Sequence, residues 1–242
     1  MHSMKIIPVI DILDGEVVHG IAGNRERYQP IESRLSDSSL PERIVQGFLD
    51  LYPFERIYIA DLNSLERDGD SSSAVARLVK QFPSVEFLID AGFQTKVQLD
   101  NYATGCPFAP ILATEAFSSA TQYQQLRNKL ADRPYILSLD HHNGRLGASD
   151  VFDRPALWPE EVIVMSLDDV GSNNGPALNL IANYQTLRPE RRFIAAGGVR
   201  NINDINVLAA QGVSAALVAS ALHAGRLSAE ELIFLRQKNA PH

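Results

Sequence analysis

The sequence predicts one α/β domain over residues 1–242, in which eight parallel strands, each followed by a helix, close into a barrel. Short apolar runs without strict alternation recur along the chain, as expected for strands covered on both faces. Helical patterns fill most of the gaps between these runs. The motifs of the first half return in the same order in the second, which indicates a half-barrel repeat over about 5–131 and 134–237. An open, doubly wound sheet is the alternative, but the eight units and the repeat favour a closed (β/α)8 TIM barrel.

Each half opens with an apolar run, an aspartate and a glycine turn. Asp11 ends the first run and is followed four residues later by Gly15, and Asp140 is followed in the same way by Gly144. Two further motifs correspond between the halves: Ala91-Gly92 with Gly197-Gly198, and Ile111–Thr114 with Leu217–Ser220. Because the carboxyl ends of barrel strands face the active site, Asp11 and Asp140 are predicted to lie on one catalytic face.

The elements can be placed in order along the chain. The expected strands cover 5–11, 56–61, 85–90, 109–113, 134–140, 162–167, 192–196 and 214–219. The expected helices cover 38–51, 71–82, 95–103, 118–131, 175–188, 201–211 and 228–237. The stretch Ser38–Glu42 predicts a capped helix start with proline in the first turn, and Ser228 with Glu231 predicts a capping box.

Two segments depart from a regular barrel. Only 21 residues separate Asp140 from Val162, and they include Pro155 and Pro159, so the fifth helix is expected to be a single turn or absent. The first loop, from Gly15 to about residue 37, is long and polar, which is typical of a lid at the catalytic face.

Composition excludes several classes of function. A net charge of −7 argues against a broad nucleic-acid or anionic-membrane surface. No apolar stretch is long enough for a membrane span, and no signal peptide is expected. The single cysteine, Cys106, rules out an internal disulfide and fits a reducing, cytoplasmic location. The sequence predicts no oligomeric state.

Asp11 and Asp140 are the candidate catalytic residues, since two carboxyl groups flanking a small substrate suit general acid–base work. The alternative is that each simply holds loop amides. Asp61, at the end of the second strand, is interpreted as a brace for its loop. His141 and His142 diverge in direction and lack a third ligand at useful spacing, so no metal site is predicted.

Several of these motifs resemble a known family. Pro8-Val9-Ile10-Asp11 with its glycine turn, Ser138-Leu139-Asp140 with its own turn, and Ala196-Gly197-Gly198-Val199 are similar to the ProFAR isomerases of histidine biosynthesis. They resemble less closely the cyclase subunit of imidazole glycerol phosphate synthase. The likeness runs from about Lys5 to Leu235. It implies an Amadori rearrangement of an aminoaldose to an aminoketose, with Asp11 and Asp140 as the acid–base pair, Asp11 favoured as the base, and without a cofactor.

The resemblance also implies a phosphorylated small-molecule substrate with two phosphates, one held by each half. The candidate phosphate contacts are Gly197, Gly198, Ala219 and Ser220 in the second half, Gly92 and Thr114 in the first, and Arg25 in the first loop. Glycine backbone at helix starts suits an anion. Thr114 with Glu115 is equally compatible with an ordinary helix start, and Arg25 with a solvated loop charge.

The departures from the family pattern predict a divergent member. Met165 and Val170 stand where the isomerases carry a threonine and an acidic residue, and Ser166 or Asp168 could substitute only if the strand end is rearranged. Asp90 replaces a glycine of the first phosphate grip, where an ionised carboxylate would repel an anion. The segments Val170-Gly171 and Trp158-Pro159 resemble a divergent group associated with methanopterin or methanofuran synthesis.

Three functions therefore remain open. The first is acid–base chemistry on a changed phosphorylated, sugar-like substrate, with one-carbon cofactor synthesis suspected. The second is genuine ProFAR isomerase activity. The third is a non-catalytic relative that binds a phosphorylated ligand or a partner protein.

Overall fold

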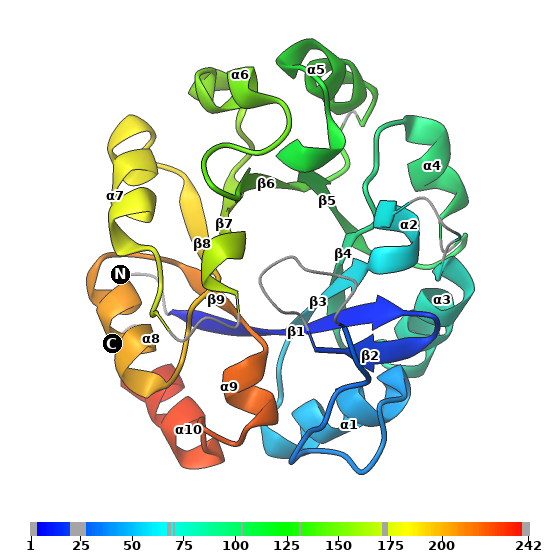
Figure 1. Cartoon of the computed structure of the whole chain (residues 1–242), viewed down its shortest axis with the longest axis vertical. Helices are drawn as coiled ribbons and strands as arrows, with labels where there is room; N and C mark the ends of the chain where they lie inside the picture. Colours follow the sequence, from blue (N-terminus) through cyan, green and yellow to red (C-terminus); the bar gives the residue numbers. More distant parts are fainter. Residues whose placement is uncertain are drawn as a thin grey trace.

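The computed structural model describes residues 4–19, 28–66, 69, 71–102, 104–130, 132–170 and 174–238. Within them, eight parallel strands form a closed barrel, because the first strand pairs on one side with the second and on the other with the last. Figure 1 looks down this barrel, with helices arranged around it. The predicted (β/α)8 TIM barrel is therefore confirmed.

The barrel strands lie within a few residues of their predicted positions. They are β1 (Lys5–Leu13), β3 (Arg56–Asp61), β4 (Glu86–Asp90), β5 (Ala109–Ala113), β6 (Ile136–His141), β7 (Glu161–Ser166), β8 (Arg192–Ala196) and β9 (Ala215–Val218). A short strand that the sequence did not predict, β2 (Glu16–Val18), pairs antiparallel with β1. This hairpin extends β1 to Leu13, beyond the predicted end at Asp11.

The outer helices also follow the prediction. They are α1 (Pro41–Leu51), α3 (Ser72–Gln81), α4 (Lys96–Asn101), α5 (Ala120–Lys129), α6 (Ser149–Phe152), α7 (Leu178–Leu187), α8 (Ile202–Ala210) and α10 (Ala229–Lys238). Short helical turns follow four of the strands: α2 (Leu62–Glu66), α9 (Ser220–His223), and the 3₁₀ turns η2 (Thr114–Ala116) and η4 (Leu167–Asp169). A further 3₁₀ turn, η3 (Pro155–Leu157), follows α6. Of these, only a helix start at Thr114 was considered from the sequence. Each is too short to produce a helical repeat in the sequence.

One of the two predicted helix caps is confirmed. Ser228 and Glu231 form the reciprocal hydrogen bonds of a capping box at the start of α10. The cap expected for α1 is wrong, since Leu40 occupies the N-cap position and makes no side-chain cap. The Ser39 hydroxyl instead donates to Glu16 Oε1 at 2.7 Å, which joins the start of α1 to the β2 hairpin.

The shortened fifth unit is confirmed, because α6 has only four residues and is followed by the single turn η3. Trp158 fills the space beside it. Its indole is buried, packs edge-on against Tyr184 and Phe193, and donates from Nε1 to the Val151 carbonyl at 3.0 Å. The large side chain thus supports the sheet where a full helix is missing.

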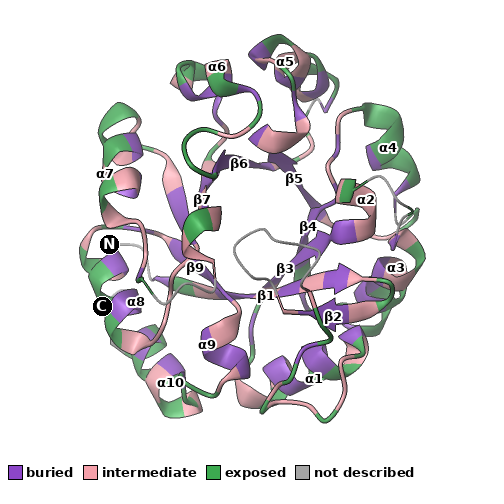
Figure 2. Cartoon of the chain, in the orientation of Figure 1, coloured by how far each residue is buried: buried purple, intermediate pink, exposed green. Residues whose placement is uncertain are grey.

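The core has two layers. The larger lies between strands and helices, and a smaller one fills the barrel interior. In Figure 2 the strands are mostly buried and the outward helix faces are exposed. The interior layer includes Ile7 of β1, Leu88 of β4 and Ile136 of β6. Since side chains alternate along a strand, Asp11, Asp90 and Asp140 lie on the same inward face as these residues, nearer the carboxyl ends.

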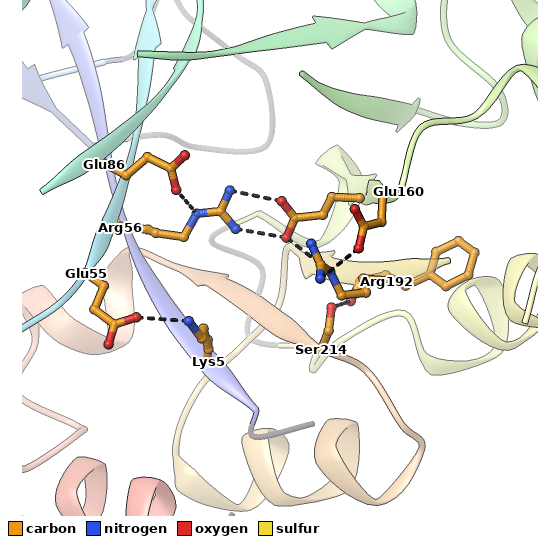
Figure 3. A network of polar contacts seen from close by, with 9 residues as sticks. Lys5, Glu55, Arg56, Glu86, Glu160, Arg192 and Ser214 are labelled. Atoms are coloured by element: carbon orange, nitrogen blue, oxygen red, sulfur yellow. Dashed lines mark hydrogen bonds and ion pairs between the residues drawn. The ribbon is translucent and has the colours of Figure 1, made fainter. Parts of the chain in front are cut away.

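Charged side chains gather at the opposite, amino-terminal end of the barrel. Figure 3 shows Arg56, at the start of β3, paired with Glu86 of β4. Glu161 of β7 binds it as well. The Arg56 guanidinium binds Glu161 in bidentate fashion, at 2.9 and 3.0 Å. Arg192 of β8 pairs with Glu160 at 2.9 Å. Opposite charges from four strands or strand starts therefore close this end of the barrel.

Candidate active site

A cavity of about 330 Å³ opens at the carboxyl ends of the strands, the catalytic face of this fold. Its lining includes the polar residues Asp11, Tyr58, Asp90, Glu115, Asp140, His142, Asp169, Arg200, Ser220 and Arg226. The two aspartates predicted from the repeat, Asp11 on β1 and Asp140 on β6, therefore face one cavity. Asp11 is half-buried, whereas Asp140 is almost fully enclosed.

The carboxyl group of Asp140 is held by three donors. The Ser138 hydroxyl donates to Oδ1 at 2.5 Å. The Thr114 hydroxyl and the backbone N–H of Glu115 donate to Oδ2 at 3.0 and 3.1 Å. The Thr114 hydroxyl also accepts the backbone N–H of Asp140 at 2.9 Å. Because η2 begins directly after β5, it places the Thr114 hydroxyl and the Glu115 N–H at the end of the neighbouring strand β6.

The environment of Asp140 changes its acidity. Burial, and then the negative charge of Glu115, raise its pKa to about 7, while the three hydrogen bonds oppose the rise. A carboxyl group with a pKa near 7 is present in both protonation states under ordinary conditions. It can therefore donate a proton to a substrate or accept one from it. An ordinary aspartate, with a pKa near 4, is almost fully ionised at neutral pH and is a poor acid.

A second buried carboxyl group, Asp90, stands at the end of β4. It accepts hydrogen bonds from the Tyr58 hydroxyl at 3.1 Å and from the Gly92 N–H at 3.2 Å. Burial, followed by the negative charges of Glu115 and Asp140, raises its pKa to about 8. The sequence interpretation treated Asp90 as an ionised group that repels phosphate. With this pKa the carboxyl is mostly protonated near pH 7, so that like-charge penalty is much smaller than expected.

The strand ends β8 and β9 form the opposite side of the cavity. Gly197 and Gly198 line it with φ values of 101° and 77°, a backbone conformation that favours glycine. A Cβ atom at either position would strike a backbone carbonyl, of Ser166 and of Gly175 respectively. Ala219 and Ser220, at the start of α9, line the cavity beside them. All four predicted contacts of the second half are thus brought together.

The predicted contacts of the first half are arranged differently. Gly92 and Thr114 are not part of the cavity lining, and each donates to a carboxyl group of the chain itself. The Thr114 side chain is fully buried. Thr114 also begins η2, which is the helix-start alternative of the sequence interpretation. Arg25 lies outside the described residues.

The end of β7 contains an acidic group that the sequence interpretation missed. Met165 and Val170, which stand where the isomerases carry a threonine and an acidic residue, line the cavity. Asp169 lines it beside them. The Ser166 hydroxyl donates to Asp169 Oδ2 at 2.6 Å. Asp168 instead pairs with His142 Nδ1 at 2.9 Å and accepts the Asn143 N–H. Asp169, rather than Ser166 or Asp168, therefore brings a carboxyl group to this part of the cavity.

Two basic residues near the glycine side were also missed. Arg200 and Arg226 line the cavity, and Arg200 forms a two-point ion pair with Asp204 of α8. Arg200 follows Gly198 by two residues, so its nearness to that strand end was the available signal. Arg226 follows the turn after α9, which had not been predicted, and the sequence carried no comparable signal for it.

Neighbouring polar residues have structural roles. Asp61 is buried and accepts hydrogen bonds from Ser64, Ser71 and Tyr102, which confirms it as a brace for the β3 loop. His141 is buried away from the cavity and contacts the Tyr184 hydroxyl at 2.9 Å, while His142 faces the cavity. The divergence predicted for the two histidines is therefore confirmed.

The described residues contain neither a membrane-spanning helix nor a metal-binding group of side chains. None of their helices combines the length and apolarity required to cross a membrane. Among the same residues, no group of three or more His, Cys, Asp or Glu side chains is placed to hold a metal ion.

Comparison with known proteins identifies the family. Residues 5–228 match the family model described as "Histidine biosynthesis protein". An uncharacterized protein of Methanocaldococcus jannaschii is 29% identical over 234 residues, covering 95% of this chain and 98% of that protein. The phosphoribosyl imidazole carboxamide isomerase (ProFAR isomerase) of Nitrosopumilus maritimus is 23% identical, with 94% and 98% covered. Subunit HisF of imidazole glycerol phosphate synthase from Prochlorococcus marinus is 26% identical, with 96% and 93% covered.

The family model spans most of the chain, and its relatives align along nearly their whole length. This chain belongs to the histidine biosynthesis protein family.

Proposed function

We propose that this chain catalyses an acid–base rearrangement of the aldose–ketose type on a phosphorylated, sugar-like metabolite. Asp11 and Asp140 are the catalytic residues, and Gly197, Gly198 and Ser220 hold the phosphate. One observation carries the proposal: Asp140 is buried, fixed by three hydrogen bonds and poised with a pKa of about 7 in the cavity that Asp11 also lines. Raised pKa values of this kind, caused by burial and a neighbouring like charge, are typical of catalytic acids.

The chemistry needs one proton donor and one acceptor. The acid, Asp140 in its protonated form, gives its proton to the ring oxygen as the C1–O bond of the sugar opens. The base, Asp11 as carboxylate, then removes the proton from C2 to give an enol or enamine, which tautomerises to the ketose when C1 is protonated. No electrons are exchanged with an outside reagent, so these two groups and an ordered substrate suffice.

We further propose that the substrate differs from that of the histidine pathway. Met165 lines the cavity where the isomerases carry a threonine, and a thioether cannot donate the hydrogen bond that a hydroxyl provides. The resemblance of the Trp158 and Val170 segments to the divergent group supports a phosphorylated intermediate of methanopterin or methanofuran synthesis. Genuine ProFAR isomerase activity is the second candidate, favoured by the relatives of that name and by the raised pKa of Asp90, which lessens the expected repulsion.

The first experiment measures whether the protein removes the C2 proton of a candidate substrate. The purified protein is incubated in deuterated water with ProFAR and with a panel of sugar, pterin and furan phosphates, and C2 exchange and product formation are measured. For the active compound, Asp11→Asn and Asp140→Asn are each expected to lose at least about 10²-fold in turnover while largely keeping binding. Asp50→Asn, the same change on the outer face of α1, is the control. Near-normal turnover in both active-site variants would contradict the proposed roles.

The second experiment separates the two candidate substrates. A bacterium lacking its own ProFAR isomerase is transformed with this chain at ordinary expression. Because Met165 replaces the threonine, we expect no growth without histidine. Growth would favour the histidine-pathway activity and contradict the changed substrate.

A further inference from the structure

We propose that the cavity selects a monophosphate whose other end carries a basic nitrogen group, and that Asp90 and Glu115 are the residues that recognise this group. The inference rests on the proposed function and identifies the class of substrate. It starts from a contrast across the cavity: glycine backbone and Ser220 line it at the ends of β8 and β9, and Asp90, Glu115 and Asp140 line it at the ends of β4, β5 and β6.

On the carboxyl side, the donors that the described residues offer at the ends of β4 and β5 are already engaged by the chain itself. The N–H of Gly92 is directed to Asp90 Oδ1. The Thr114 hydroxyl and the Glu115 N–H are both directed to Asp140 Oδ2. These are the groups at the ends of β4 and β5 that could have bound an anion, and the chain's own carboxyl groups already accept their protons. A phosphate placed here would have to displace a buried carboxyl from each donor.

The same side is crowded with acidic groups. Asp90, Glu115 and Asp140 line it together, and the charge of Glu115 contributes to the raised pKa of both buried aspartates. A second anion would add to this repulsion. A cationic amine would oppose it and would draw the buried carboxyl groups toward their ionised form. Recognition of an amine therefore couples to proton release from the cavity.

The opposite side is suited to a single phosphate. Gly197 and Gly198 leave their backbone exposed to the cavity, because no Cβ can occupy either position. Ser220 begins α9 beside them, and Arg200 and Arg226 also line the cavity. Arg200 and Arg226 are thus found on this side, with Asp169 beside Gly197, whereas Asp90, Glu115 and Asp140 lie at the ends of β4, β5 and β6. This uneven distribution gives the cavity a direction along which an amino-phosphate would lie.

The test compares three matched probes by titration calorimetry at about pH 7: glucose 6-phosphate, glucosamine 6-phosphate and glucose 1,6-bisphosphate. The amino sugar phosphate is expected to bind at least about tenfold more tightly than glucose 6-phosphate, and the bisphosphate at least about tenfold more weakly. Repeating the titration in buffers of different ionisation enthalpy is expected to reveal proton release with the amino sugar phosphate but not with glucose 6-phosphate.

Two variants locate the selectivity. Glu115→Gln and Asp90→Asn remove charge without changing shape, and each is expected to reduce the preference for the amino sugar phosphate by about tenfold while leaving glucose 6-phosphate binding nearly unchanged. Asp90→Asn is also expected to reduce the proton release. Glu115 is only half-buried, so its variant tests the proposal even if Asp90→Asn folds poorly. Asp50→Asn serves again as the control outside the cavity.

The outcomes separate this inference from the function on which it rests. Bisphosphate binding as tight as or tighter than monophosphate binding overturns the inference, and so does an amine preference that survives in both variants. Neither result touches the acid–base roles of Asp11 and Asp140. If the wild-type protein binds none of the three probes and no inorganic phosphate, the proposed phosphate site at Gly197, Gly198 and Ser220 is wrong. This result overturns the proposed function together with the inference.

Discussion

The two ends of the barrel both carry charged groups, but they handle them in opposite ways. At the amino-terminal end, Arg56 pairs with Glu86 at 2.8 Å (Figure 3) and with Glu161 at 2.9 Å. At the carboxyl end, Asp90 and Asp140 are buried beside Glu115, and their pKa values rise to about 8 and about 7. Charge is neutralised by pairing at one end and by holding protons at the other.

The difference separates stability from function. Paired ions at the strand starts fix the closure of the barrel, since Arg56 and Glu161 come from strands on different sides of it. The buried carboxyl groups of Asp90 and Asp140 cost free energy but keep protons available near neutral pH. This agrees with the general pattern of the fold, in which the carboxyl face carries the chemistry and the amino face carries stability.

The largest expected effect on stability is at the amino-terminal end. Arg56→Met leaves Glu161 without its bidentate partner, and we expect the free energy of unfolding to fall by about 3 kcal/mol, the lower end for breaking a largely buried pair. Urea denaturation monitored by circular dichroism measures this. The double variant Arg56→Met with Glu161→Gln removes both charges and is expected to recover part of the loss. A loss below about 1 kcal/mol in Arg56→Met would show that the ion pairs contribute little to closure.

The next largest effect is a pH dependence set by the carboxyl end. The pKa values of Asp90 and Asp140 are raised in the folded protein, so between about pH 4 and pH 8 the folded state binds more protons than the unfolded state. Stability therefore falls as pH rises through this window. Asp90→Asn removes one of the two groups, and from about pH 5 to pH 8 we expect it to lose on the order of 2 kcal/mol less than the wild type. Parallel curves for the two proteins would mean that Asp90 is not held protonated.

A smaller effect is expected on turnover when the support of Asp140 is weakened. Thr114→Val keeps the shape but removes the hydroxyl that both donates to Asp140 Oδ2 and accepts its N–H. Since that donor lowers the pKa of Asp140, the pH–rate profile is expected to shift upward by up to about one unit. Turnover is expected to fall about tenfold near pH 7, because the carboxyl group loses a hydrogen bond that positions it. Thr114→Ser restores a hydroxyl and is expected to rescue both. A fall in turnover without a shift of the profile would indicate a structural role only.

The sequence predicted the fold because each strand and long helix carries its own local pattern, and the predicted repeat led to the placement of Asp11 and Asp140 on one face. It did not predict the charge of the site. Counting by twos from Leu88 would have placed Asp90 on the inward face, but its protonation depends on burial by β3, β5 and β6, which no local pattern encodes. The Arg56–Glu161 pair spans 105 positions and exists only because the barrel closes. Asp169 escaped notice because the end of β7 turns into η4, too short a segment to be recognised in sequence.

The smallest expected effect distinguishes two ion pairs at the same end of the barrel. Lys5 and Glu55 meet at 2.9 Å, close to the Arg56 network in Figure 3, but their side chains are 55% and 63% exposed. Water screens such a pair and two long side chains must be ordered to form it, so Lys5→Met is expected to change the free energy of unfolding by less than about 0.5 kcal/mol. The same denaturation experiment that measures Arg56→Met provides the comparison. If the two variants lose similar amounts, burial is not what makes the Arg56 pairs matter, and the contrast between the two ends of the barrel would have to be explained by the number of charges rather than by their environment.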